Sequence, residues 1–196
     1  VRAALHRTAR GAPIVTEADR HRWDARHREA GAEPSAPVLA PAPFADLVDR
    51  FPTSGTALDL ACGRGSGAVW LASRGLTVTG VDLSPVAVGL AQEHATALGL
   101  VDRCVFRVVD LDEGIPDGPA VDVVLCHLFR DSRLDAAVVD RLVPGGLLAI
   151  AVLSEVGAAA GRHRVPAGEL RRAFGPRLHV LADGEADGRA WLLGRR

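Results

Sequence analysis

The stretch Ala57-Leu-Asp-Leu-Ala-Cys-Gly-Arg-Gly-Ser-Gly-Ala-Val-Trp-Leu-Ala72, followed by Thr77-Val-Thr-Gly-Val-Asp82, decides the fold of this chain. An apolar run, a glycine-rich turn, a helical pattern and a second apolar run that ends in an acid predict a β-loop-α-β unit. The glycines of the turn allow positive φ and let a ligand approach the backbone closely. The helix that follows directs its unpaired N–H groups at the turn, which favours an anionic or strongly polar group there.

Two acids point to the kind of ligand. Asp82 lies 17 positions after Gly65 at the carboxyl end of the second strand, where a carboxylate can accept hydrogen bonds from ribose hydroxyls. Asp59 lies inside the first strand, and burying it unpaired would be costly. A carboxylate there suits a cofactor that carries cationic groups, such as an ammonium and a sulfonium, better than it suits a pyrophosphate.

At this point a second function, that of a nicotinamide-dependent oxidoreductase, remains an alternative. The segment Gly63-x-Gly65-x-x-Ala68 satisfies the dinucleotide fingerprint, although a lone match of that kind is a weak signal. Such an enzyme would need a second constellation, for example a Tyr-x-x-x-Lys pair, and the chain has neither tyrosine nor lysine. A cofactor-binding but catalytically inactive sensor or partner protein is a further alternative.

Three segments resemble the motifs of class I S-adenosylmethionine-dependent methyltransferases. They are Asp59-Leu-Ala-Cys-Gly-Arg-Gly65, Val81-Asp-Leu-Ser-Pro85 and Arg141-Leu-Val-Pro-Gly-Gly-Leu-Leu148, and the resemblance runs in order from about residue 55 to residue 153. The departures are Ala61, where many members have glycine, and Gly67, which is often Asn or Ala. Neither departure removes a chemical group that the site needs.

The resemblance implies a fold and a cofactor site. The expected fold is α/β: a doubly wound, Rossmann-like seven-stranded sheet with an antiparallel last strand and helices on both faces. In the family pattern, Asp59 and the loop backbone hold the methionine portion of S-adenosylmethionine, and Asp82 takes the ribose hydroxyls. Leu83 and Leu111 sandwich the adenine, and Asp110 accepts its exocyclic amine. The implied cofactor-binding residues are Asp59, Ala61, Gly63, Gly65, Asp82, Leu83, Asp110, Leu111 and Cys126. For Asp82 and Asp110 the alternative is an ordinary loop acid, and Asp112 and Glu113 stand close to the latter.

His127 is the candidate catalytic residue. Methyl transfer is a one-step in-line displacement, so the protein chiefly aligns the acceptor with the methyl group and excludes water. His127 follows the fourth predicted strand and has a pKa suited to accepting a proton at neutral pH. The alternative is a histidine that faces solvent or contacts only the cofactor. Glu155 and the cluster Arg162-His163-Arg164 could border the same pocket, where the cluster would favour an anionic acceptor; a solvated loop is the alternative for it.

The composition of the chain limits the kinds of partner that we expect it to bind. With 196 residues, 48% of them hydrophobic, one α/β domain is expected. The net charge of −1 gives no electrostatic reason to expect nucleic acid or a membrane as partner, and no apolar run is long enough to span a bilayer. Cys62, Cys104 and Cys126 lack the spacing of a metal site, which predicts buried thiols in a reducing cytoplasm and no metal. Cys126-His-Leu-Phe129 stands where an Asn-Pro-Pro-Tyr-type motif would suggest a macromolecular acceptor. We therefore expect a small-molecule acceptor and a cytoplasmic monomer or homodimer.

The chain is expected to divide at residue 43. Residues 1–43 form an N-terminal extension with a helix at about 17–30 and a proline-rich connector, and residues 44–196 form the methyltransferase domain. Thr16 with Asp19 predicts the helix start. Trp23 either anchors a solvated helix or belongs to a lid, because residues 23–28 resemble the N-terminal segment of tellurite-resistance and thiopurine methyltransferases, which folds over the cofactor. The chain begins at Val1 and has no methionine; Val15 is a credible start, and residues 1–14 are expected to be loosely tied.

The remaining patterns predict alternating strands and helices. Asp183-Gly184 and Asp187-Gly188 are turn signals within a closing hairpin. The expected helices are 44–51, 66–74, 85–99, one that is capped by Asp131, and 166–174. The further expected strands are 77–82, 104–109, 121–126, 147–153, 177–181 and 190–193.

Overall fold

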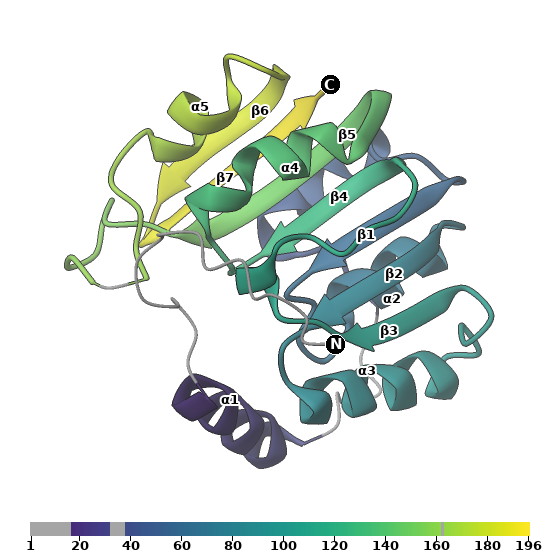
Figure 1. The fold of residues 1–196 in the computed structure, drawn as a ribbon. Coiled ribbons are helices and arrows are strands. Elements are labelled where there is room, and N and C mark those ends of the chain that lie inside the picture. Colours follow the sequence, from purple (N-terminus) through teal and green to yellow (C-terminus); the bar gives the residue numbers. More distant parts are fainter. Residues whose placement is uncertain (1–16, 32–37, 162) are drawn as a thin grey trace, which may run out of the picture.

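A seven-stranded sheet forms the centre of the molecule (Figure 1). The structure is a computed structural model that describes residues 17–31, 38–161 and 163–196. The strand order is β3-β2-β1-β4-β5-β7-β6, and β7 is antiparallel to both of its neighbours while the other neighbouring pairs are parallel. The predicted fold class is confirmed. The strands are β1 (Thr56–Leu60), β2 (Thr77–Asp82), β3 (Cys104–Val108), β4 (Val121–His127), β5 (Leu142–Leu153), β6 (His179–Ala186) and β7 (Arg189–Arg195).

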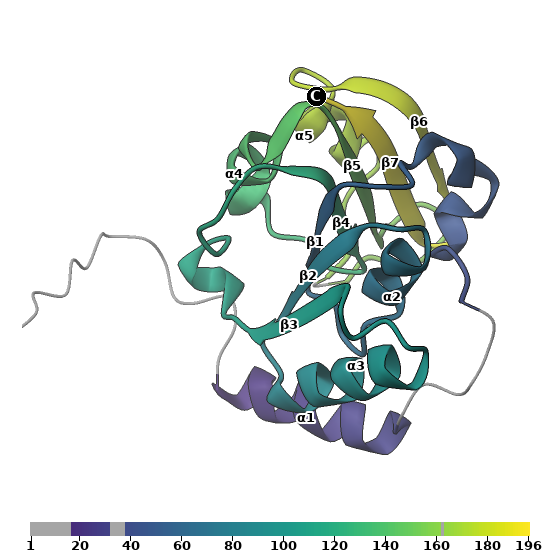
Figure 2. The same ribbon diagram turned by 90° about the vertical axis from the view of Figure 1, so that its right-hand side faces the viewer.

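Helices cover both faces of the sheet (Figure 2). The 3-10 helix η1, α2 and α3 lie on one face, and α4 and α5 lie on the other; α1 packs against α3. The helices are α1 (Glu17–Ala30), η1 (Ala42–Arg50), α2 (Ser66–Ser73), α3 (Pro85–Ala97), η2 (Leu111–Glu113), η3 (Ser132–Leu134), α4 (Asp135–Asp140) and α5 (Glu169–Phe174). No helix among the described residues is long and apolar enough to cross a membrane.

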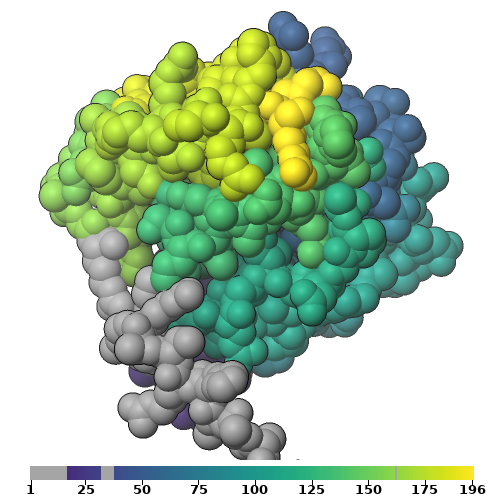
Figure 3. Space-filling model, turned by 45° about the horizontal axis from the view of Figure 1, so that its top comes forward, coloured from purple at the N-terminus to yellow at the C-terminus, as the bar shows by residue number. Residues whose placement is uncertain are grey.

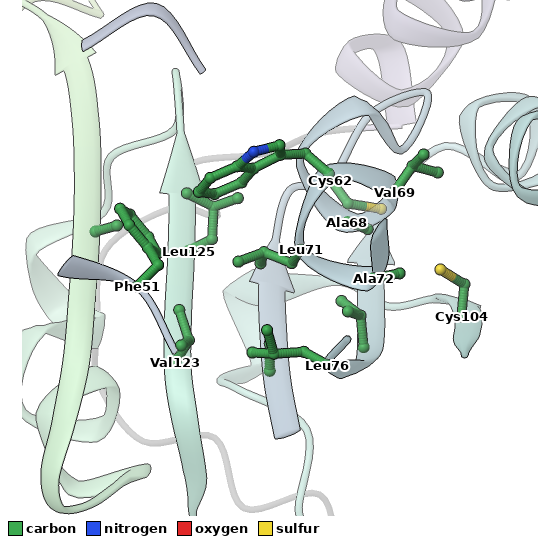
Figure 4. Packing of buried hydrophobic residues seen from close by; sticks show 14 of the residues in the cluster. Phe51, Cys62, Ala68, Val69, Leu71, Ala72, Leu76, Cys104, Val123 and Leu125 are labelled. Carbon is green, nitrogen blue, oxygen red and sulfur yellow. The ribbon is translucent and has the colours of Figure 1, made fainter. Parts of the chain in front are cut away.

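Alternation along the strands divides the core into two clusters. Ala57 belongs to the cluster under α2, whereas Leu58 and Leu60 belong to the cluster under α4 and α5. Figure 4 shows side chains of α2 facing Val123 and Leu125 of β4 in the first cluster. In the space-filling view the C-terminal third of the chain, yellow-green to yellow, forms one continuous surface with the green and teal middle part of the chain (Figure 3).

The strand order places a ligand site at one edge of the sheet. The chain runs outward from β1 through β2 to β3 and then returns to the other side of β1 with β4. Ligands of open α/β sheets bind outside the carboxyl ends of the strands at such a reversal. The carboxyl ends of β1 and β4 are therefore where the site is expected.

Three predicted elements differ in type or bounds from those observed. The helix expected at 44–51 is the 3-10 helix η1, which begins at Ala42. Strand β5 begins at Leu142 rather than at 147, because Val121 already pairs with Leu142 and a bulge follows. Helix α5 begins only at Glu169, after Gly168 in the left-handed conformation (φ 71°).

The expected turn at Asp183-Gly184 lies instead inside β6. A Cβ at position 184 would stand 2.8 Å from the indole nitrogen of Trp191, so glycine allows that side chain to lie against the strand. The hairpin turn is at Asp187-Gly188 alone, between β6 and β7.

Helix α1 docks through acids rather than through its tryptophan. Trp23 is 43% exposed, so it is not the anchor that the sequence suggested. Asp19 and Asp24 are the buried residues of the helix, and Asp24 accepts a hydrogen bond from the buried Ser84 hydroxyl at the start of α3. Residues 1–16, including the alternative start at Val15, and residues 32–37 of the connector lie outside the described residues.

Candidate functional site

The loop between β1 and α2 has the backbone that the glycine spacing predicts. Gly63 (φ 53°) and Gly65 (φ 83°) are left-handed, and Ala61, two residues before Gly63, adopts φ 52°. A Cβ on Gly65 would stand 2.8 Å from the Cβ of Ala91, so this glycine allows α3 to pack closely on the loop. The Gly63 N–H is directed at Asp82, at the end of β2.

Asp82 ends β2 and is held by two backbone groups. The Gly63 N–H donates to Oδ2 and the Ser84 N–H donates to Oδ1, each at 2.9 Å. Each carboxylate oxygen accepts one of these two bonds and so keeps a lone pair for a further donor. The side chain is half-buried at the carboxyl edge of the sheet, which is suitable for binding a vicinal diol.

Asp59 lies beneath the first turn of α2. It is 2% exposed, and the Ala68 N–H donates to its carboxylate. Burial raises the pKa of Asp59 to about 8; the Ala68 hydrogen bond opposes this shift, and the charge of Asp82 adds to it. An uncompensated carboxylate in this position favours a cationic partner.

The residues predicted for the adenine follow β2 and β3, which are neighbours. The Val109 N–H donates to the Asp82 carbonyl at 2.9 Å, so the two strand ends lie together. Leu83 is half-buried and Leu111 is buried. The Asp110 carboxylate accepts the Asp112 N–H at 2.9 Å and caps η2, so one of its oxygens already has a structural role.

The last two residues of β4 face opposite sides of the sheet. Cys126 belongs to the cluster under α4 and α5, donates to the Phe129 carbonyl at 3.2 Å, and has its pKa raised by burial to about 12. His127 lies two residues after Leu125 and thus on the face that carries Asp59. Its Nε2 is buried and has no hydrogen-bond partner among the described residues. Burial, and then the positive charge of Arg189, lower the pKa of His127, so its imidazole is neutral at pH 7.

In the basic loop after β5, the described residues of the Arg162-His163-Arg164 cluster have different environments. Arg164 donates to the Ser154 carbonyl at 2.6 Å and to the Gly188 carbonyl at 2.8 Å, so it braces the loop against the β6–β7 turn. His163 and Glu155 are exposed, and Arg162 lies outside the described residues.

The N-terminal helix adds residues that the motif analysis missed. His27 of α1 lies over the glycine loop, with its Cε1 3.7 Å from the Cβ position of Gly63. Burial lowers the pKa of His27 and the nearby Asp82 charge opposes that shift. Arg64 of the loop donates to the Gly31 carbonyl at 3.0 Å. The resemblance of residues 23–28 to a lid was the one available signal for these contacts.

The donor set fits S-adenosylmethionine. The loop has no side chain at Gly63, Asp82 offers free lone pairs to a ribose, and the buried Asp59 suits an ammonium group. All three cysteines are free, and the described residues contain no group of three or more His, Cys, Asp or Glu side chains that could hold a metal ion.

Comparison with known proteins places this site in a family. Residues 57–146 match the family model described as a methyltransferase domain. The chain is 30% identical over 179 residues to a ubiquinone biosynthesis O-methyltransferase of Xanthomonas euvesicatoria pv. vesicatoria, covering 87% of this chain and 72% of that protein. It is 27% identical over 183 residues to a 2-heptyl-1-hydroxyquinolin-4(1H)-one methyltransferase of Mycobacteroides abscessus, covering 83% of this chain and 80% of that protein. The chain spans only 37%, 56% and 59% of the length of three other curated relatives that it matches.

Solved structures agree at the level of the fold. TehB from Haemophilus influenzae superposes with a TM-score of 0.69 at 16% identity, covering 80% of this chain and 62% of TehB. The matched family model contains both the glycine loop and Asp82, which lie together in this structure. Their arrangement at the β1–β4 reversal and the likeness over most of the chain lead to one assignment. The chain belongs to the class I S-adenosylmethionine-dependent methyltransferases, and S-adenosylmethionine is its cofactor.

Proposed function

We propose that the protein methylates an oxygen or nitrogen atom of a small-molecule acceptor, with His127 as the base. The observation that carries the proposal is that Asp59 and His127 share one face of neighbouring strands. Asp59 pairs with Leu125, and His127 lies two residues further toward the carboxyl edge. Ideal strand spacings then give about 8 Å between the Cα atoms of Asp59 and His127.

The roles of the residues follow from this arrangement. Asp82 would hold the ribose through its free lone pairs, and the ionised Asp59 would hold the cationic end of the methionine portion. Bound S-adenosylmethionine supplies an electrophilic methyl group on a sulfonium. The acceptor forms its bond to the methyl carbon as the carbon–sulfur bond breaks, and the electrons of that bond stay on sulfur. The neutral imidazole of His127 would take the proton that the acceptor loses.

A small acceptor is supported by the relatives and by the chain itself. The Mycobacteroides abscessus protein is named for a hydroxyquinolone, and the Xanthomonas protein for ubiquinone biosynthesis. The net charge of −1 gives no attraction for a nucleic acid. The segment after β4, Cys126-His-Leu-Phe129, lacks the Asn-Pro-Pro-Tyr motif that would suggest a macromolecular acceptor.

The base role is tested by His127→Ala, with His127→Gln as a variant that keeps the size of the side chain. Each is expected to lower kcat by about 10²-fold or more, because general base catalysis contributes on that order, while S-adenosylhomocysteine binding is retained. The wild-type kcat should fall only below the ordinary histidine pKa, since burial and Arg189 shift the His127 pKa downward. His179→Ala, an exposed histidine at the start of β6, is the matched control. Unchanged turnover in both His127 variants would remove the base from the proposal.

A further inference from the structure

We propose that the methyl acceptor is a small organic anion and that Arg189, at the start of β7, is the residue that selects it. The inference rests on the proposed function, because it concerns the acceptor of the same site. It names a class of substrate, a compound with a carboxylate or an acidic hydroxyl group, and one residue that recognises the charge.

The pairing of the strands brings Arg189 to the edge where His127 ends β4. His127 pairs with Ala151 of β5, and the Leu128 N–H donates to the Ala151 carbonyl at 2.7 Å. Two residues further along β5, Leu153 pairs with Arg189. The carboxyl ends of β4 and β5 and the start of β7 therefore share one edge of the sheet (Figure 1).

Alternation places the two side chains on the same face. Ala151 and Trp191 both belong to the cluster on the η1 and α2 side of the sheet. Arg189 lies two residues before Trp191, and His127 pairs with Ala151. Because side chains alternate along a strand, Arg189 and His127 both lie on the face of the sheet that carries Trp191 and Ala151. Ideal strand spacings put their Cα atoms about 12 Å apart, and a small aromatic or heterocyclic acid can contact both side chains across such a gap.

Arg189 is available to a ligand, unlike Arg164 at the same corner. Its side chain is exposed and forms no ion pair or hydrogen bond with any of the residues that the structure describes. Arg164, by contrast, is engaged by the Ser154 and Gly188 carbonyls. Of the nearby acids, Glu185 accepts the Gly168 N–H at 2.8 Å, and neither Glu155 nor Asp187 forms an ion pair with Arg189.

The pair Arg189 and His127 is chemically matched to an anionic acceptor. The His127 Nε2 is buried without a partner, so a ligand atom at this edge can supply its missing hydrogen bond. Burial, and to a smaller extent the charge of the Arg189 guanidinium, lower the pKa of His127 and favour its neutral imidazole. A guanidinium also binds a carboxylate or an ionised hydroxyl through two parallel N–H bonds.

The test compares charged and uncharged acceptors. A panel of hydroxybenzoates, aminobenzoates and hydroxyquinoline carboxylates, each paired with its carboxamide, is incubated with radiolabelled S-adenosylmethionine, and KM and kcat are measured for every methylated compound. The acids are expected to have KM values at least tenfold below those of their amides. Arg189→Gln should raise the KM of the acids at least tenfold, change kcat less than about threefold and abolish the preference, and Arg189→Lys should restore part of it.

Arg195→Gln is the matched control, because Arg195 lies on the same strand and face but at the opposite edge of the sheet. Equal KM values for acids and amides, a preference for the amides, or equal effects of Arg189→Gln and Arg195→Gln would overturn the inference. Binding of S-adenosylhomocysteine distinguishes a failure of this inference from a failure of the proposed function. If it binds to all variants, a lost acid preference concerns Arg189 alone; if it binds and no compound is methylated, the proposed function fails and this inference with it.

Discussion

Asp59 is a carboxyl group that is buried in the ligand-free protein, before a cationic ligand binds. Burial raises its pKa to about 8, whereas the same group in the unfolded chain titrates near 3.8. Between these two values the unfolded state has lost the proton that the native state keeps. The unfolded state therefore binds fewer protons, and the free energy of unfolding falls as the pH rises from about 4 to about 8.

Asp59→Asn should remove this pH dependence. We expect the variant and the wild type to melt at similar temperatures at pH 4, and the variant to melt at a higher temperature by an increasing margin up to pH 8. Calorimetric melting of the ligand-free protein at pH 4, 6 and 8 measures the difference. Asp49→Asn, an exposed acid of η1, serves as the control. A constant difference between variant and wild type across this range would show that Asp59 is ionised in the native protein.

Single residues differ in how far the sequence reveals them. The glycine at 63 and the acid at 82 follow from spacing, because a β-loop-α-β unit places them at one strand end, and the structure joins them by a hydrogen bond. His27 and Arg189 could not be found in this way. His27 reaches the loop through the docking of α1, and Arg189 reaches His127 through the register of two strand pairs, and neither arrangement leaves a local pattern.

Among the elements, α1 has the weakest intrinsic reason to be ordered. It has almost no apolar face, so its helical state depends on what it docks against. The buried Asp24 carboxylate accepts the Ser84 hydroxyl, while the same Ser84 oxygen accepts the Ala87 N–H at 3.1 Å and caps α3. One serine therefore joins the helix that covers the glycine loop to the helix that follows Asp82.

Asp24→Ala should release α1 without unfolding the domain. A hydrogen bond to a charged group contributes about 1.5–3 kcal/mol, so protection of the α1 amides from hydrogen exchange should fall about tenfold or more. The midpoint of global melting should shift by less than about 2 °C, because the core clusters do not include this helix. Glu29→Ala, an exposed acid of the same helix, is the control. Unchanged exchange in Asp24→Ala would mean that another contact holds the helix.

The sequence predicts most elements because their patterns are local, and it fails where a distant partner decides. The strand predicted at 121–126 and the helix predicted at 85–99 correspond to the observed β4 and α3. The turn expected at Asp183-Gly184 was wrong, because this glycine accommodates the Trp191 indole. The anchor expected at Trp23 was wrong because the buried partner of α1, Ser84, lies 60 positions away in the chain.

At the scale of the whole molecule, one topological feature assembles the site. The reversal of strand order at β1 brings the carboxyl ends of β2, β1 and β4 side by side, and these ends carry Asp82, the glycine loop and His127. The addition of β7 beside β5 extends the same edge to Arg189. The part that binds the cofactor and the part proposed to bind the acceptor therefore belong to one sheet.

The measurement that tests the account most directly is a calorimetric titration of the protein with S-adenosylhomocysteine, with NAD as the comparison ligand and Asp82→Ala as the variant. We predict micromolar binding of S-adenosylhomocysteine and none of NAD. Affinity should fall about 10²-fold or more in Asp82→Ala, since two charge-assisted hydrogen bonds at about 1.5–3 kcal/mol each are lost. Asp112→Ala, an acid that the structure pairs with Arg133, is the control and should bind as the wild type does. Binding of NAD alone, or equal affinity in Asp82→Ala, would contradict the account.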